Sequence, residues 1–352
     1  MKVSYLERWV QSPVAGRRRK AIKLLTKYAM RNKYDLAKIF DFAKNAVNDD
    51  NWQVRATAVS CLTQLALKNN SILNDVVGIY LELLGKEEHH NVIGNILRGF
   101  STLISRYDLD QIEDIYRMSM SLIDNANNDI KHGAICLLTN IGLRFEEKIS
   151  EIVDKFGKII DTVPPLLKKD ILESIRRLYL KYPDRLNKTF AEITHNYLNE
   201  ADFLPRKEAL INLSYLIRND HAEINNELID IIRRRLRDSK VAVRIVAIDV
   251  VDAVLEKNAE LVDKFMDIIA NEILLRAKNN RLKIRTLQML LKHIEKIPRE
   301  ITYRYNLSRA LDILEYNTIP KNEDLRTIKT LARKLLEEKL GYGYEERIRL
   351  RK

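Results

Sequence analysis

A period of 37 to 41 residues runs through the sequence and constrains the fold more than any other feature. The segment 53–67 places Val54, Ala58, Leu62 and Leu65 at offsets of 0, 4, 8 and 11 residues, and these offsets fall on one face of an α-helix. The same template recurs nine times, with first residues Arg17, Val54, Val92, Ile130, Leu167, Pro205, Val243, Lys283 and Asp324. This regularity is typical of a chain built from repeated structural units.

The other columns of the repeat have the same chemistry. At offsets 4, 8 and 11 all 27 positions are apolar, although only 46% of the chain is apolar. Offset 5 adds a second apolar stripe in the first seven units, from Ile22 to Ile248. A helix pair of this size cannot bury its apolar surface alone, so we expect one stripe to cover a helix of the same unit and the other to cover a neighbouring unit.

Further amphipathic stretches alternate with these helices, for example at 72–85, 109–123, 151–160 and 260–275. Each unit is therefore predicted to be an antiparallel pair, whose first helix we call A and whose second we call B. The B helices are expected near residues 16–31, 52–67, 91–106, 128–144, 165–181, 204–218, 241–256, 281–296 and 322–339. We predict an all-α fold, an α-solenoid superhelix of about nine such pairs. A single repeat array is expected over residues 1–340, followed by a short basic tail at 341–352.

The B helix resembles the second helix of the HEAT repeat, which has the pattern D-x-x-x-V-R-x-x-A-x-x-x-L-x-x-L, and the segment 50–65 fits it closely. The resemblance to armadillo/HEAT-like and adaptin-like solenoids covers nearly the whole chain, and it specifies architecture rather than activity. It implies about nine HEAT-like pairs. It also implies that Asp50, Arg55, Asp238 and Arg244 belong to a structural ladder of acids and arginines between repeats.

The sequence contains no signature of catalysis or metal binding. Its six histidines and two cysteines, Cys61 and Cys136, have no spacing typical of metal ligands. No glycine-rich phosphate loop and no nucleophile motif is present. We therefore expect a protein that is not an enzyme and that needs no cofactor and no metal.

Offsets 2, 6, 9 and 13 fall on the remaining side of each B helix, which in HEAT arrays commonly lines the concave surface. In the second to fourth repeats this side carries one charge in twelve positions, which is low for a surface exposed to water. It is a candidate strip for a protein partner, comprising Ala56, Ser60, Thr63, Arg98, Ser101, His132 and Thr139. The alternative is that the strip packs against neighbouring helices of a tight superhelix, with Gly94, Gly99, Gly133 and Gly142 allowing close approach.

The chain has a formal net charge of +12, and the surplus lies in the N-terminal and C-terminal thirds. Such a bias favours contact with anions such as a nucleic-acid backbone. The candidate anion or nucleic-acid contacts are Arg17, Arg19, Lys20, Lys23, Lys169, Arg176, Arg285, Lys292, Arg326 and Arg333. The alternative, which involves no ligand, is that the same charges form a solvated surface rich in Lys and Glu.

Two functions follow as hypotheses. The first is a non-catalytic scaffold or adaptor that binds a protein partner on its concave surface, and a regulatory subunit of a larger complex would have the same sequence features. The alternative is a solenoid that binds nucleic acid independently of sequence through its basic terminal repeats. No stretch approaches the roughly 20 apolar residues of a membrane span, and the first residues do not form a signal peptide. We therefore expect a cytoplasmic protein without membrane insertion, and the oligomeric state stays open.

Overall fold

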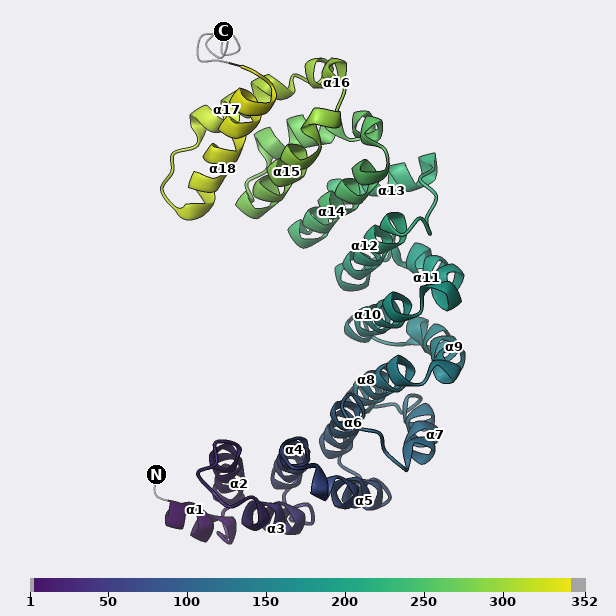
Figure 1. Cartoon of the computed structure of the whole chain (residues 1–352), viewed down its shortest axis with the longest axis vertical. Helices are drawn as coiled ribbons and strands as arrows, with labels where there is room; N and C mark the ends of the chain where they lie inside the picture. Colours follow the sequence, from purple (N-terminus) through teal and green to yellow (C-terminus); the bar gives the residue numbers. More distant parts are fainter. Residues whose placement is uncertain (1–2, 343–352) are drawn as a thin grey trace. The chain divides into compact units, whose positions relative to one another are not determined.

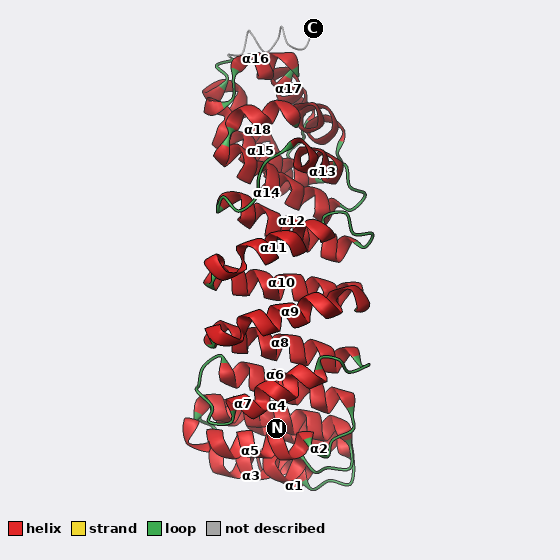
Figure 2. Ribbon diagram, turned by 90° about the vertical axis from the view of Figure 1, so that its right-hand side faces the viewer, coloured by secondary structure: helices red, strands yellow, loops and turns green. Residues whose placement is uncertain are grey.

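A computed structural model describes residues 3–342, and in this part of the chain the secondary structure is helical throughout, without strands (Figure 2). The predicted all-α fold of about nine helix pairs is confirmed. The chain divides into two compact units, Met1–Pro183 (unit 1) and Asp184–Lys352 (unit 2). Of the predicted basic tail only Gly341 and Tyr342 are described, and 343–352 lie outside the described residues.

Unit 1 consists of five helix pairs arranged in two layers (Figure 1). The A helices are α1 (Val3–Val10), α3 (Leu36–Ala46), α5 (Leu73–Leu84), α7 (Ile112–Leu122) and α9 (Ile149–Ile159). The B helices are α2 (Ala15–Met30), α4 (Trp52–Lys68), α6 (His90–Ile104), α8 (Asn128–Arg144) and α10 (Pro165–Lys181). Short 3₁₀ turns at Asn70–Ile72, Glu146–Lys148 and Ile160–Thr162 join them. Each B helix contacts the next B helix, so the B layer is continuous from α2 to α10.

Unit 2 has the same arrangement with less regular A helices. Its B helices are α12 (Phe203–Arg218), α14 (Val241–Lys257), α15 (Asn280–His293) and α18 (Glu323–Lys334). Its A helices are α11 (Pro183–Tyr197), α13 (Asn226–Leu236), the short α16 (Arg299–Arg304) and α17 (Leu307–Asn317). A 3₁₀ turn at Ile294–Lys296 follows α15, and α18 continues as a π-helix over Leu335–Lys339.

The A helix expected at 260–275 is interrupted. It begins as a 3₁₀ segment, Ala259–Lys264, and continues as a π-helix, Ile268–Arg276. The wider turns of a π-helix change the angle between successive side chains. Ile268, Ile269 and Ile273 of this segment are buried in the core.

The repeat columns form the core. Of the 27 positions at offsets 4, 8 and 11, all are buried except Tyr28 and Leu291, which are half-buried. The second stripe, from Ile22 to Ile248, is buried throughout. Burial of two stripes on each B helix joins its own A helix to the next pair, because apolar area removed from water is the main stabilising contribution to such a stack.

Polar side chains fix where most B helices begin. The side chains of Asn51, Asn127 and Asp202 each accept a hydrogen bond from the backbone N–H two residues later. Asn279 and Asn322 accept from the third residue after them. These caps satisfy backbone donors that have no partner within the helix, so the start of the repeat is set locally by the residue before each B helix.

Candidate functional site

The candidate partner strip lies on the B layer of unit 1, and the structure divides it into a buried part and an accessible part. Thr63, Ser101 and Thr139, all at offset 9, are buried. Thr63 Oγ1 lies 2.6 Å from the Tyr80 hydroxyl, Ser101 Oγ donates to a carbonyl of α8 over 3.0 Å, and Thr139 Oγ1 donates to a carbonyl of its own helix over 2.6 Å. Thr63 and Ser101 therefore join neighbouring helices, Thr139 bonds within its own helix, and none of the three hydroxyls is available to a partner.

The accessible part of the strip comprises Ser60, which is exposed, and Arg98 and His132, which are half-buried. Arg98 donates to Asn95 Oδ1 over 2.9 Å, and His132 Nε2 lies 3.6 Å from Asp170 Oδ2. Ala56 is 8% exposed at the edge of the same surface.

Two glycines bring α6 and α8 unusually close together. A Cβ atom on Gly133 would lie 2.9 Å from Leu97 Cβ and 3.1 Å from the Gly94 carbonyl oxygen, and one on Gly94 would lie 3.0 Å from the Asp129 carbonyl oxygen. All three distances are shorter than ordinary van der Waals contact. Glycine at these positions therefore allows the close helix approach that buries Ser101 and Thr139.

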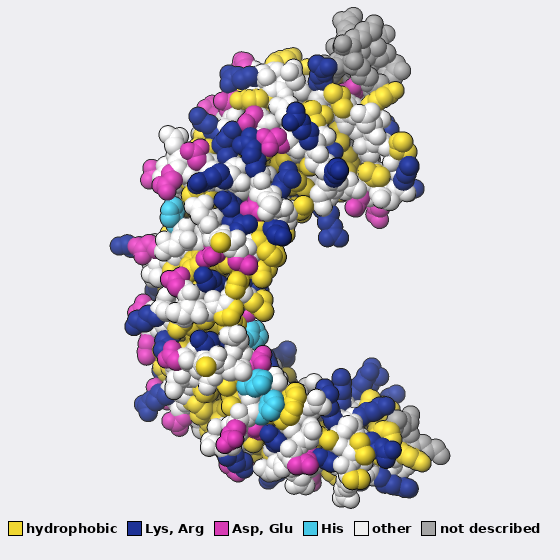
Figure 3. Space-filling view, turned by 180° about the vertical axis from the view of Figure 1, so that it is seen from behind, with side chains coloured by type: hydrophobic (Ala, Val, Ile, Leu, Met, Phe, Trp, Pro, Cys, Tyr) yellow, Lys and Arg dark blue, Asp and Glu magenta, His cyan; other side chains and the backbone are white. Residues whose placement is uncertain are grey.

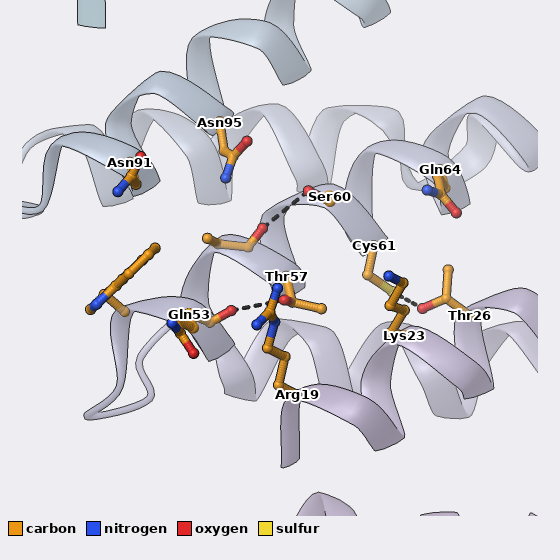
Figure 4. A pocket seen from close by; sticks show the side chains of 12 residues that line it. Arg19, Lys23, Thr26, Gln53, Thr57, Ser60, Cys61, Gln64, Asn91 and Asn95 are labelled. Atoms are coloured by element: carbon orange, nitrogen blue, oxygen red, sulfur yellow. Dashed lines mark hydrogen bonds between the residues drawn. The ribbon is translucent and has the colours of Figure 1, made fainter. Parts of the chain in front are cut away.

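A pocket opens on the same layer between α2, α4 and α6 (Figure 4). It has a volume of about 340 Å³ and includes Ala56 and Ser60 of the candidate strip. The other residues that line it are Arg19, Lys23, Thr26, Trp52, Gln53, Thr57, Cys61, Gln64, Asn91 and Asn95. The pocket thus combines small side chains, four amides and two cations, and no carboxylate lines it.

The two cations of the pocket are unpaired. Arg19 and Lys23 are exposed, and neither forms an ion pair with another residue of the range 3–342. They belong to a run on α2 with Arg17 and Lys20, whose charged groups lie 5.7 and 5.8 Å from the centre of the Trp9 ring. Lys and Arg side chains gather at this N-terminal end of unit 1 in Figure 3. The region therefore offers net positive charge to an approaching anion.

The thiol in the pocket is not suited to nucleophilic chemistry. Cys61 is 3% exposed and its sulfur lies 2.8 Å from Thr26 Oγ1. Burial raises the pKa of the Cys61 thiol to about 12, whereas a reactive cysteine has a lowered pKa. Within residues 3–342 no cluster of three or more His, Cys, Asp or Glu side chains could hold a metal ion.

Four of the other candidate anion contacts form ion pairs with acids of this chain. Lys169 Nζ lies 2.7 Å from Glu173, and Arg333 Nη2 lies 2.9 Å from Glu315. Arg285 and Lys292 lie 3.2 and 3.0 Å from the carboxylate of Asp252. Arg176 is half-buried and Arg326 is exposed. Acidic side chains therefore accompany four of the candidate anion contacts on these B helices.

Asp252 is the centre of a buried charge cluster in unit 2. It is 4% exposed and contacts Arg218 at 3.4 Å and His293 Nε2 at 2.7 Å, besides Arg285 and Lys292. Burial alone would raise the pKa of Asp252, but hydrogen bonds from His293 and Lys292 outweigh it and lower the pKa. The cluster joins α12, α14 and α15, and it holds Arg218, Arg285 and Lys292 in ion pairs.

Arginines at offset 1 connect successive helix pairs. Arg18 bonds Asp49 over 2.7 Å and also contacts Asp50. Arg55 bonds Glu87 over 2.6 Å. Each reaches an acid at the end of the next A helix, and Arg55 also donates to the Asp49 carbonyl before its own helix over 2.8 Å.

The same contact recurs in unit 2 with one exception. Arg206 bonds Asp238 through Nε at 2.8 Å and Nη2 at 3.1 Å, and it donates to the Ala201 carbonyl over 2.8 Å. Arg244 instead donates to the Leu236 carbonyl over 2.9 Å, so it bonds backbone rather than an acid. The acid of one pair thus meets the arginine of the preceding pair.

A second column of cations, at offset 14, was missed by the sequence reasoning. Lys68 Nζ donates to the carbonyls of Ala29 and Met30 over 2.8 and 3.1 Å, and Arg144 Nη1 donates to the Ile104 carbonyl over 2.7 Å. Lys181 contacts the Leu143 carbonyl in the same way. Each caps the C-terminus of the preceding B helix, where carbonyls lack partners and the helix dipole favours a cation. The basic residues at this offset are visible in the sequence, but their role depends on the adjacent pair.

Comparisons with known proteins agree with this geometry. Residues 39–68 match the HEAT repeat family. Yeast importin-beta (Kap95p) has a TM-score of 0.65 to this chain at 17% identity, over 96% of this chain and 45% of its own. Kap95p in a structure on its binding of RanGDP has a TM-score of 0.63 at 16% identity, over 96% and 46%. An engineered protein has a TM-score of 0.52 at 14% identity, over 99% and 97%.

The fold is that of a HEAT-repeat α-solenoid. The chain spans less than half the length of the karyopherins that it resembles. No curated protein sequence matches it. No helix of residues 3–342 has the length and apolar character needed to cross a membrane.

Proposed function

We propose that this protein is a non-catalytic scaffold and that the pocket between α2, α4 and α6 binds an acidic segment of a protein partner. One observation carries the proposal: the pocket is lined by two unpaired cations, Arg19 and Lys23, and by no carboxylate. A carboxylate placed between them would gain two charge-assisted hydrogen bonds.

The amide side chains of the pocket suit an extended backbone. Gln53, Gln64, Asn91 and Asn95 each offer a donor and an acceptor, which is the complement of a peptide group. They come from α4 and α6, so they follow the direction from one helix pair to the next. An extended peptide that lies across the B helices would place successive backbone N–H and C=O groups beside these amides. Hydrogen bonds to the peptide backbone are a common means of peptide recognition.

The likeness to karyopherins supports a protein partner. Kap95p binds RanGDP, and it has the same fold as this chain at a low identity. We carry over only the general property that such a solenoid holds a protein on its surface. A stable role as a regulatory subunit of a larger complex is consistent with the same pocket.

A nucleic-acid backbone is the second candidate, and one observation favours it. The unpaired cations gather on a single helix, α2, where Arg17, Arg19, Lys20 and Lys23 are all exposed. A protein that uses these four contacts would bind duplex DNA without reading sequence, and its affinity would fall steeply between 50 and 200 mM salt. The acids that pair with Lys169, Arg285, Lys292 and Arg333 on other B helices favour an acidic peptide over a long duplex.

Capture from a native lysate of the source cell, with the full chain immobilised, distinguishes the two. The test variant is R19E/K23E, and the matched control is R31E/K33E, which reverses two exposed cations just beyond α2. We expect proteins with acidic segments to be retained after nuclease treatment, to be depleted at least tenfold by R19E/K23E and to be unaffected by the control. Equal capture by all three chains would reject the pocket, and capture that nuclease abolishes would favour nucleic acid.

A further inference from the structure

A second hollow lies in unit 2, away from the B-helix face, between α11, α12 and α13. It has a volume of about 550 Å³. Its floor is apolar, formed by Leu198, Leu213, Leu216 and Leu228, which are all buried. An adjoining hollow of about 590 Å³ is lined in part by the same residues, among them Ala191 and Glu223. The two form a groove large enough for several consecutive residues of a peptide.

The rim of this groove is acidic in a protein of net charge +12. Glu192, Glu223 and Glu227 are exposed on it. Glu227 lies 3.7 Å from His195 Nε2, whereas Glu192 and Glu223 have no ion-pair partner within residues 3–342. Lys188 is the one lysine or arginine among the groove residues. An apolar floor with free carboxylates above it is complementary to an apolar side chain flanked by cations.

One buried polar atom in the groove lacks a partner. Thr194 lines the hollow and is 1% exposed, and its Oγ1 has no hydrogen bond. Other buried helical threonines, such as Thr26 and Thr286, donate to the carbonyl four residues earlier. A buried hydroxyl without a partner is unfavourable, so a ligand that supplies a donor or acceptor to Thr194 would be favoured in this groove.

We propose that residues 347–352 of this chain, Arg-Ile-Arg-Leu-Arg-Lys, are the ligand of this groove. They lie outside the described residues, and their sequence alternates apolar Ile348 and Leu350 with four cations. In an extended peptide successive side chains point to opposite sides, so Ile348 and Leu350 would face the leucine floor together while the three arginines, on the other side of the peptide, reach the glutamates of the rim.

Either the same chain or a second copy could supply the segment. Eight residues after Tyr342 span at most about 28 Å. Three neighbouring B-helix contacts, α18 to α15, α15 to α14 and α14 to α12, separate α18 from the groove, and each step is about 8–10 Å. The chain's own groove is thus at the limit of reach, and a second copy has no such limit.

A titration tests the docking. A fluorescein-labelled peptide of residues 343–352 is titrated with the full chain carrying I348S/L350S, so that its own segment does not compete. We expect saturable binding that weakens at least tenfold when E192K/E223K is added. The matched control adds E260K/E300K, which reverses two exposed glutamates elsewhere in unit 2, and it should bind as before. Circular dichroism checks that all variants are folded.

A second peptide separates specific docking from charge attraction alone. The peptide with Ile348→Ser and Leu350→Ser keeps every cation and should bind at least tenfold more weakly. If it binds as tightly as the native peptide, or if E192K/E223K changes nothing, the proposal is overturned.

Cysteine trapping then locates the segment in the full chain. In L350C/A222C we expect a disulfide under mild oxidation, seen on a non-reducing gel as a faster-migrating looped monomer or as a dimer of twice the mass. Either product supports the docking and shows which copy supplies the segment. The same pattern from L350C or A222C alone, or no product from the pair, would contradict it.

Discussion

Arg206 shows what a single residue of the repeat does. It and Asp238 are 7% and 9% exposed, and two parallel N–H···O bonds join them across a helix-pair boundary. A buried charge without its partner is strongly unfavourable. The pair therefore holds the two helix pairs in one register, and the same holds in a more exposed form for Arg18 and Arg55.

Replacing Arg206 by Met should lower the free energy of unfolding of unit 2 by up to about 3 kcal/mol, because buried Asp238 loses its bidentate partner and keeps only Arg235, at 3.1 Å. The measurement is urea denaturation followed by circular dichroism, with the transition of unit 2 analysed separately. Arg234→Met removes an exposed arginine of the same unit and should change the stability by less than about 0.5 kcal/mol. Equal effects of the two substitutions would show that the ion pair is not structural.

Acid should weaken the same contact. Burial alone would raise the pKa of Asp238, but hydrogen bonds from Arg206 and the Lys240 N–H outweigh it and hold the pKa below the ordinary value of 3.8. The folded state therefore binds fewer protons than the unfolded state near that value. The stabilising contribution of Asp238 is complete above pH 4 and is lost as the pH falls through the lowered pKa.

We expect Tm to be nearly constant from pH 7 to pH 5 and to fall below about pH 4. In Asp238→Asn the fall should be shallower, because one of the titrating carboxylates is gone. A Tm that rises on acidification, or an unchanged slope in Asp238→Asn, would contradict this assignment.

At the scale of one helix, its rotational position determines what each column does. With about 100° per residue, offset 5 points about 140° from the first residue, offset 9 about 180°, and offsets 2 and 6 about 200° and 240°. Ser60, at offset 6, is exposed, whereas Thr63, at offset 9, is buried. The buried face of α4 thus extends from the second apolar stripe through Thr63 to Ala56, at about 200°, and Ser60, at about 240°, lies beyond it.

The fold could be predicted from the sequence, whereas the exposure of the candidate site residues could be predicted only in part. The apolar columns depend on periodicity within each helix, and the sequence contains that period. Whether Ser101 and Thr139 reach solvent depends on the distance between α6 and α8, which two glycines on facing helices set together. The neutralisation of Arg285 and Lys292 likewise depends on Asp252 in another pair. Such contacts depend on residues of two helices, so the sequence pattern of either helix alone does not indicate them.

The glycines supply a prediction at this scale. Gly133→Ala should lower the free energy of unfolding by about 1–3 kcal/mol, although alanine is the better helix former, because its Cβ would meet Leu97 and the Gly94 carbonyl. Gly157→Ala, on α9 with open space around it, should instead raise stability by about 0.5–1 kcal/mol. Chemical denaturation of the two variants gives the signs, and the same sign for both would disprove the close-approach role of Gly133.

At the scale of the molecule, the positive charge is unevenly available. The columns at offsets 1 and 14 place arginines and lysines in bonds between helix pairs, and the Asp252 cluster uses several more. The exposed cations on α2 are one part of the surplus that faces solvent beside a pocket. The net charge of +12 is consequently weak support for nucleic-acid binding by the whole chain. The unpaired cations at the N-terminal end of unit 1 are the more informative feature.

The most direct test of the central claim fills the pocket without changing its charge. Ser60→Trp places a large side chain among the four amides, and Thr102→Trp makes the same change at an exposed position of α6 outside the lining. We measure the affinity of a partner captured by the unmodified chain for both variants by calorimetry. We expect at least a tenfold loss of affinity for Ser60→Trp and none for Thr102→Trp, and full affinity of the Ser60→Trp variant would show that the pocket is not the binding site.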